Sequence, residues 1–109
     1  IRGPPRSTLF PYPTLFRSPV GPVFSVSQIG HPYQGRVTLM VNEDLRQDGD
    51  LNQMIWKVPE MISYLSEYFE LQPGDVIMAG TPSGVNAVQT GDSIVATIEG
   101  VGTLSVTVV

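Results

Sequence analysis

The 109-residue chain contains no cysteine, which excludes a disulfide framework, a thiolate metal site and a cysteine nucleophile. Basic residues are few, six against ten acidic ones, and the net charge of −4 argues against nucleic-acid binding. No apolar run approaches a membrane span and no signal-peptide core opens the chain, so we expect a cytoplasmic protein without membrane contact. The single histidine, His31, has no acidic neighbour in sequence to orient it, so we expect a loop residue and not a catalytic base.

The composition changes sharply near Ser18. All ten acidic residues follow it, whereas residues 1–18 hold three of the six basic residues and four of the ten prolines. Prolines lack amide donors and block helices and central strands, so this opening is poor material for a packed domain. It resembles the translation of a common sequencing adapter and departs from it only at Gly3 and Pro13. We therefore expect residues 1–18 to be adapter-derived and disordered, and residues 19–109 to form the domain; a natural proline-rich tail is the alternative.

Short apolar and β-branched segments dominate the remainder. They predict strands over residues 23–26, 36–41, 45–48, 76–79, 93–99 and 103–109. Asn42-Glu43 or Glu43-Asp44 is expected to close a first hairpin, because asparagine tolerates the positive φ of such turns, and residues 100–102 a second. Asp48-Gly-Asp50 is interpreted as a polar break after the first hairpin.

One amphipathic helix is expected between these strands. Pro59 and Glu60 suit its first turn, and apolar residues at helical spacing extend it for about three turns. These residues are Met61, Ile62, Leu65 and Phe69. The fold class is therefore α+β, mostly β with one helix.

Few residues are candidates for chemistry. Gly80-Thr-Pro-Ser-Gly84 offers hydroxyl and amide groups suited to a carboxylate or phosphate, although ordinary turns share this composition and no P-loop lysine follows. Asp48 and Asp50 lack the spacing of a calcium loop, so a solvated turn is the better interpretation. From the residues alone we expect no nucleophilic or metal constellation.

A run of motifs extends from Val41 to Gly102. Its parts are Val41-Asn42, Arg46-Gln47, Gly49, Met54-Ile55, Val58-Pro59-Glu60, Pro73–Ile77, Gly80–Val85, Gly91-Asp92 and Glu99–Gly102. In order and spacing the run resembles the C-terminal part of the fumarylacetoacetate hydrolase family, and within it most resembles the fumarylpyruvate hydrolase subgroup. Departures from the family pattern are Glu43 for glycine, Ala79 for threonine and Asn86-Ala87 for Gly-Pro. The resemblance implies the C-terminal part of that family's mixed β-roll, incomplete here.

The resemblance also implies an activity. Family members use carboxylate-bound Mg²⁺ or Mn²⁺ to hold the 2-oxo acid end of a 2,4-dioxo acid, while a His–Glu pair activates the water that splits a carbon–carbon bond. The favoured substrate is fumarylpyruvate, which would give fumarate and pyruvate in aromatic-compound catabolism. Acylpyruvate hydrolysis, oxaloacetate decarboxylation and isomerisation of a hydroxy-dienedioate are alternatives within the family. The full-length protein is expected to be a homodimer.

The resemblance assigns few site residues to this chain. The family's metal ligands, its His–Glu pair and its substrate lysine precede Pro19, so no catalytic residue and no metal ligand is expected here. Thr81 matches a contact to the substrate carboxylate, and Gly80 and Gly84 are expected to shape its loop. We therefore expect the parent protein to be an enzyme and this chain to be inactive. The alternative of another class is a non-catalytic β-rich binding or oligomerisation module; open sheet edges would favour aggregation of the isolated chain.

Overall fold

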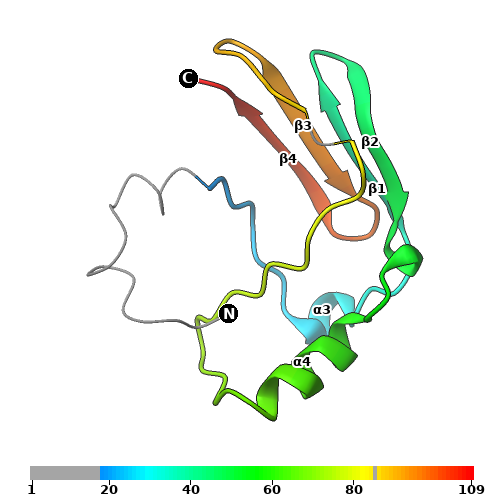
Figure 1. The fold of residues 1–109 in the computed structure, drawn as a ribbon, viewed down its shortest axis with the longest axis vertical. Helices are drawn as coiled ribbons and strands as arrows, with labels where there is room; N and C mark the ends of the chain where they lie inside the picture. The colour runs from blue at the N-terminus through cyan, green and yellow to red at the C-terminus, as the bar shows by residue number, and fades with distance from the viewer. Residues whose placement is uncertain (1–17, 85) are drawn as a thin grey trace.

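The computed structural model describes residues 18–84 and 86–109, so the predictions made for residues 1–17 and for Val85 lie outside the described residues. Its centre is one antiparallel sheet in the strand order β2-β1-β3-β4 (Figure 1). The strands are β1 (Arg36–Val41), β2 (Asp44–Asp50), β3 (Ser93–Ile98) and β4 (Gly102–Thr107). The helical segments are α3 (Val26–Ile29), the 3₁₀ turn η1 (Leu51–Gln53) and α4 (Val58–Ser66). The predicted class, mostly β with one principal helix, is confirmed.

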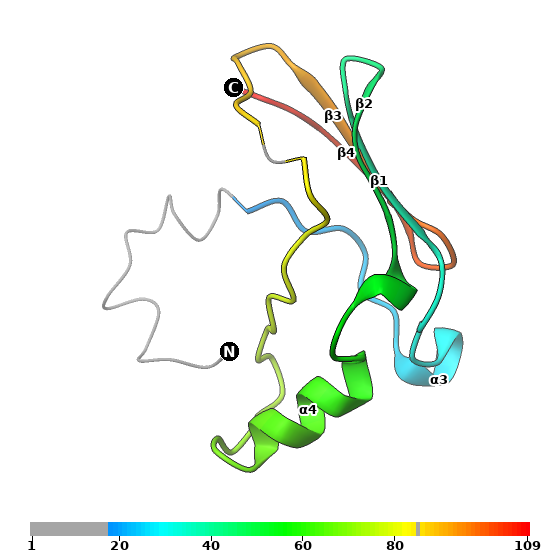
Figure 2. The same ribbon diagram turned by 45° about the vertical axis from the view of Figure 1, so that its right-hand side comes forward.

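The helices lie beyond one end of the sheet. Figure 2 shows the sheet nearly edge-on, as a single curved layer with α4 below it. The chain between α4 and β3 then runs back past the sheet to its opposite end. This returning segment carries the Gly80–Gly84 loop, so the fold places that loop beside strands that are distant in sequence.

Both predicted hairpins are present, although the second turn consists of residues 99–101 and not 100–102, because Gly102 already pairs with Ile98. The turn between β1 and β2 consists of Asn42 and Glu43, with φ of 50° and 72°, and Val41 pairs with Asp44. Positive φ at both central residues matches the right-handed twist of the flanking strands. Of the two turn positions that the sequence allowed, the structure adopts Asn42-Glu43. Glu43 therefore holds a left-handed conformation, which explains why the family pattern has glycine at this position.

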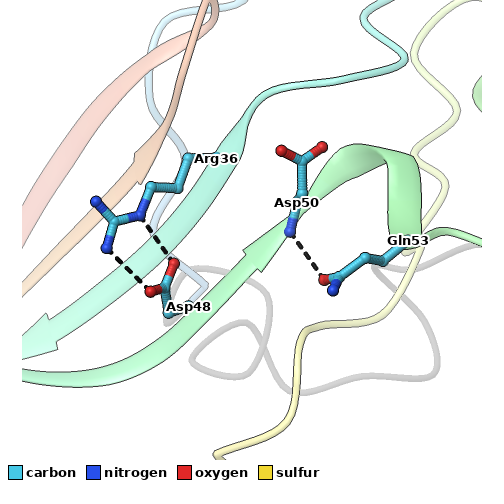
Figure 3. A network of polar contacts seen from close by, with 4 residues as sticks. All are labelled: Arg36, Asp48, Asp50 and Gln53. Carbon is cyan, nitrogen blue, oxygen red and sulfur yellow. Dashed lines mark hydrogen bonds and ion pairs between the residues drawn. The ribbon is translucent and has the colours of Figure 1, made fainter.

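The polar break expected at Asp48-Gly-Asp50 is wrong. These residues belong to β2, where Asp48 pairs with Thr38 and Asp50 with Arg36. The Arg36 guanidinium donates two hydrogen bonds of 2.9 Å to the Asp48 carboxylate, diagonally across the two strands (Figure 3). These two hydrogen bonds lower the pKa of Asp48 and raise the pKa of Arg36. A paired, solvated carboxylate is therefore compatible with a strand, which the composition alone did not indicate.

Two predicted strands are absent. The segment 23–26 is extended only to Ser25, after which α3 begins, and the Ser25 amide donates to Gln28 Oε1 at 2.9 Å. This capping interaction favours a helical turn over a strand. Residues 76–79 are irregular, with Met78 75% exposed, and they connect α4 to the Gly80–Gly84 loop without joining the sheet. A short apolar run does not by itself identify a strand.

The helix α4 begins as expected and ends early. The Lys57 amide donates to Glu60 Oε1 at 2.9 Å, which caps the first turn, and Pro59 lies within that turn. The helix ends at Ser66, so Phe69 lies outside it. Amides of the following turn bond three residues back, Tyr68 to the Leu65 carbonyl at 3.0 Å, which tightens the end of the helix.

The sheet and helices bury little apolar surface among themselves. Val41, 1% exposed, is the only buried hydrophobic side chain of the described residues. Several large apolar side chains are instead open to solvent, among them Ile55 at 91% and Met78 at 75%. Within the described part of the chain, no helix combines the length and apolar character needed to cross a bilayer.

Candidate functional site

The Gly80–Gly84 loop lies against the free edge of β2. A Cβ added at Gly49 in that strand would lie 3.2 Å from the Pro82 ring. A Cβ added at Gly84 would lie 2.1 Å from the carbonyl oxygen of Arg46. The approach at Gly84 leaves no room for a side chain, whereas a Cβ at Gly49 would be tightly packed against the loop.

A β-bulge in β2 creates one of these contacts. Met40 pairs with Leu45 and Leu39 pairs with Gln47, so Arg46 is an extra residue without a partner on β1. Bulges commonly redirect backbone and side-chain groups beside functional sites. Here the bulged residue is the one whose carbonyl faces Gly84.

The amide of Gln47 joins the strand to the loop. Its Nε2 donates to Thr81 Oγ1 at 2.7 Å and to the Pro82 carbonyl oxygen at 2.9 Å. The Thr81 hydroxyl also lies 3.2 Å from the Pro82 carbonyl oxygen. One half-buried side chain therefore fixes the position of two successive loop residues.

The two glycines of the loop are required for different reasons. Gly80 has a φ of +90°, but an added Cβ would meet nothing within 4 Å, so only its backbone conformation favours glycine. Gly84 has a φ of +110° and also meets the Arg46 carbonyl. Both glycines thus hold backbone conformations that favour glycine, and Gly84 also lies where a side chain would not fit.

A cavity of about 310 Å³ opens between this loop, η1 and the sheet. Its lining residues are Val37, Asp50, Leu51, Gln53, Met54, Ala79, Gly80, Thr81, Pro82 and Ile98. Val37 and Ile98 are direct partners on β1 and β3, so the sheet forms an apolar wall. Thr81 and Gly80 line the cavity, whereas Gly84 supports the loop from outside it.

The carboxylate in this cavity is engaged in local structure. Asp50 Oδ1 accepts from the Asn52 amide at 2.9 Å and from the Gly35 amide at 3.1 Å. The Asp50 amide in turn donates to Gln53 Oε1 at 2.9 Å (Figure 3). Asp50 therefore caps η1 and ties it to the start of β1. Thr81, by contrast, is exposed and lines the same cavity.

Residues 18–84 and 86–109 do not fit a divalent metal. Nowhere in these residues do three histidine, cysteine, aspartate or glutamate side chains gather closely enough to bind an ion. His31 is exposed in the loop before β1, as expected from its surroundings in the sequence. No catalytic step through a metal can be derived from these residues.

The sequence did not single out Gln47 or the apolar wall of the cavity as parts of the site. Arg46-Gln47 stood in the motif run, but nothing in the sequence showed that Gln47 faces the loop 34 residues later. The apolar residues Val37 and Ile98 gave only a strand signal. A long-range pairing of this kind needs the fold to be known.

A second, apolar cleft of about 410 Å³ lies beside α4. It is lined by Met54, Ile55, Trp56, Met61, Tyr64, Leu65, Ile77, Met78 and Ala79. The rings of Trp56 and Tyr64 lie 4.9 Å apart and those of Tyr64 and Tyr68 lie 5.2 Å apart. The chain thus presents a partly open aromatic surface on the helix side of the molecule.

Comparisons with known proteins agree with this architecture. The chain is 47% identical to the fumarylpyruvate hydrolase of Ralstonia sp over 75 residues, which are 69% of this chain and 39% of that protein. The solved fumarylpyruvate hydrolase from Pseudomonas aeruginosa, in complex with Mn²⁺ and pyruvate, matches with a TM-score of 0.78 and 48% identity, covering 82% of this chain and 38% of that chain.

A relative with another substrate shares the fold. Maleylpyruvate hydrolase from Sphingobium sp. SYK-6, in complex with manganese(II) and pyruvate, matches with a TM-score of 0.74 and 38% identity, covering 80% of this chain and 33% of that chain. The chain therefore spans about two fifths or less of each of these relatives.

The family profile described as "Fumarylacetoacetate (FAA) hydrolase C-terminal" matches residues 16–109. Because this match covers most of the chain, the chain belongs to the fumarylacetoacetate hydrolase family.

Proposed function

We propose that this chain is the C-terminal portion of a metal-dependent hydrolase that splits a carbon–carbon bond of a 2,4-dioxo acid, with fumarylpyruvate as the favoured substrate. Water and fumarylpyruvate would give fumarate and pyruvate. One observation carries the proposal: the Thr81 hydroxyl lines a cavity on a loop that Gln47 fixes to β2. The likeness to a fumarylpyruvate hydrolase with Mn²⁺ and pyruvate supports it.

The chain's own residues would bind and orient the substrate. A threonine hydroxyl that donates to a carboxylate forms a charge-assisted hydrogen bond, which is stronger than a neutral one. The apolar wall of Val37 and Ile98 would exclude water from the substrate and strengthen that bond. Thr81 is thus proposed as a carboxylate contact, with Gly80 and Gly84 as the residues that shape its loop.

The groups that activate water would come from the remainder of the full-length protein. That remainder would hold the Mg²⁺ or Mn²⁺, which would supply Lewis-acid chemistry at the 2-oxo acid end of the substrate. We propose that the metal ligands and the His–Glu pair precede this segment. The chain spans only about two fifths of the length of its relatives, which leaves room for them. The 109-residue chain alone is therefore proposed to be inactive.

A hybrid enzyme tests the proposal. Residues 19–109 replace the matching C-terminal segment of the Pseudomonas aeruginosa fumarylpyruvate hydrolase, and pyruvate release is measured with Mn²⁺. We expect the hybrid to hydrolyse fumarylpyruvate and the 109-residue chain to show no turnover. Its mass in solution tests the proposed homodimer.

The same hybrid decides among substrates of the family. Acylpyruvates, oxaloacetate and a hydroxy-dienedioate are offered under the same conditions. Preference for one of these acids would revise the substrate, while a folded, Mn²⁺-loaded hybrid inactive on all of them would contradict the proposed function.

A further inference from the structure

We infer that Gln47 is a positioning residue that fixes the Thr81 hydroxyl as a hydrogen-bond donor toward the substrate carboxylate. The inference rests on the proposed function and goes beyond it. Gln47 lies on β2 and does not line the cavity, so it would act through Thr81.

The hydrogen-bond partners of Gln47 determine the polarity of Thr81. A glutamine Nε2 carries two hydrogens, and here one faces Thr81 Oγ1 at 2.7 Å and the other the Pro82 carbonyl at 2.9 Å. Because Nε2 can only donate, Thr81 Oγ1 must accept. The single hydrogen of the Thr81 hydroxyl is then directed to another acceptor.

Among residues 18–84 and 86–109, the acceptor that faces that hydrogen is a poor one. The Pro82 carbonyl oxygen lies 3.2 Å from Thr81 Oγ1, longer than the 2.7–2.8 Å typical of O–H···O bonds. The same oxygen already accepts from Gln47. A substrate carboxylate would be a stronger acceptor, and the exposed Thr81 side chain can reach one in the cavity.

The strand holds Gln47 in this position. It pairs with Leu39 on β1 directly beside the bulged residue Arg46. The bulge and the contact between Arg46 and Gly84 fix the distance between strand and loop. A glutamate here would have nearly the same shape but would accept the Thr81 hydrogen, reversing the polarity of the pair.

A double-mutant cycle in the hybrid enzyme tests the coupling. The proteins compared are the hybrid and its Gln47→Met, Thr81→Val and Gln47→Met/Thr81→Val variants, with Gln72→Met as a matched control. Gln72 is exposed in the turn after α4. We expect Gln47→Met to raise KM for fumarylpyruvate about three- to ten-fold with kcat nearly unchanged, and to have no further effect beside Thr81→Val.

A second variant keeps the test decisive if methionine disturbs the fold. Gln47→Glu retains the length and branching of the side chain, and we expect it to raise KM by more than about ten-fold because it withdraws the hydroxyl hydrogen and adds a like charge. The inference would be overturned if Gln47→Met raised KM by the same factor with and without Thr81→Val. It would also be overturned if Gln47→Glu left KM as little changed as the control Gln72→Met does. A Thr81→Val variant with unaltered KM would instead contradict the proposed function.

Discussion

The carbonyl oxygen of Arg46 lies 2.1 Å from the position that a Cβ on Gly84 would occupy. Residue 84 can therefore carry no side chain unless the backbone of β2 or of the loop moves. This contact links the bulge in the edge strand to the loop that carries Thr81. It makes the proposed site sensitive to a single methyl group.

Gly84→Ala tests that contact. We expect it to destabilise the hybrid enzyme by about 2 kcal/mol or more, because it combines an unfavourable φ with a clash against backbone. Gly74→Ala is the control: Gly74 has a φ of +92° but nothing lies within 4 Å of an added Cβ. Gly74→Ala should lower the free energy of unfolding by about 1 kcal/mol, the cost of a positive φ in a residue with a Cβ. Equal losses in urea unfolding would show that the Arg46 contact is unimportant.

Glu43→Gly should stabilise the first hairpin. Glu43 holds a φ of 72°, which is unfavourable for a residue with a Cβ. Glycine removes that cost, partly offset by its greater freedom in the unfolded chain, so we expect a gain of about 0.5–1 kcal/mol. Glu43→Ala keeps the Cβ and should leave the free energy of unfolding nearly unchanged. A similar gain for both variants would assign the effect to the charge of Glu43.

Asp92 should make the junction before β3 sensitive to acid. Its carboxylate accepts from the Gln89 amide at 2.8 Å and from Asn42 Nδ2 at 2.8 Å, and these bonds lower the pKa of Asp92 from its ordinary value. A carboxyl whose pKa is lowered in the folded state adds stability above its unfolded pKa and loses it as the pH falls through the folded value.

The measurement is urea unfolding of the hybrid at a series of pH values from neutral to about 3, below the ordinary pKa of an aspartate. We expect Asp92→Asn to be less stable at neutral pH and to lose less stability in acid. Asn42→Ala, which removes one of the two donors, should weaken the acid dependence by less than Asp92→Asn does. An unaltered acid dependence in both variants would contradict this role of Asp92.

The exposed apolar cleft beside α4 predicts self-association of the 109-residue chain. Ile55 and Met78 line it and are 91% and 75% exposed, more than folded monomers usually tolerate in one patch. Replacing both by serine should lower the mass seen by light scattering and the binding of a hydrophobic dye. Val23→Ser is the control, because Val23 is 88% exposed but lies outside the cleft. If the unmutated 109-residue chain is monodisperse and melts cooperatively, it does not need the rest of its protein to fold, and this prediction is wrong.

The sequence predicted the elements that depend on local chemistry. The first strand, Arg36–Val41, has the predicted bounds, and the start of α4 follows from Pro59 and Glu60. Both hairpins follow from their turn residues. These signals are local because each depends on the φ, capping or alternation of a few adjacent residues.

The missed features depend on contacts between distant segments. Asp48 lies in a strand, opposite Thr38 and bonded to the Arg36 guanidinium, both of which are distant in sequence. Residues 76–79 are irregular although they are mostly apolar. Gln47 carries no local signal for the same reason, since the fold brings its partner Thr81 next to it. Family resemblance did indicate Thr81 and its glycines, and the structure then showed what holds them.

The most direct test of the central claim is the KM of the hybrid enzyme for fumarylpyruvate with Thr81→Val and with Thr81→Ser. If the Thr81 hydroxyl binds the substrate carboxylate, valine should raise KM about ten-fold or more with little change in kcat, because it loses a hydrogen bond to a charged group. Serine keeps the hydroxyl and should remain within about three-fold of the parent. A valine variant with the KM of the parent would contradict the claim.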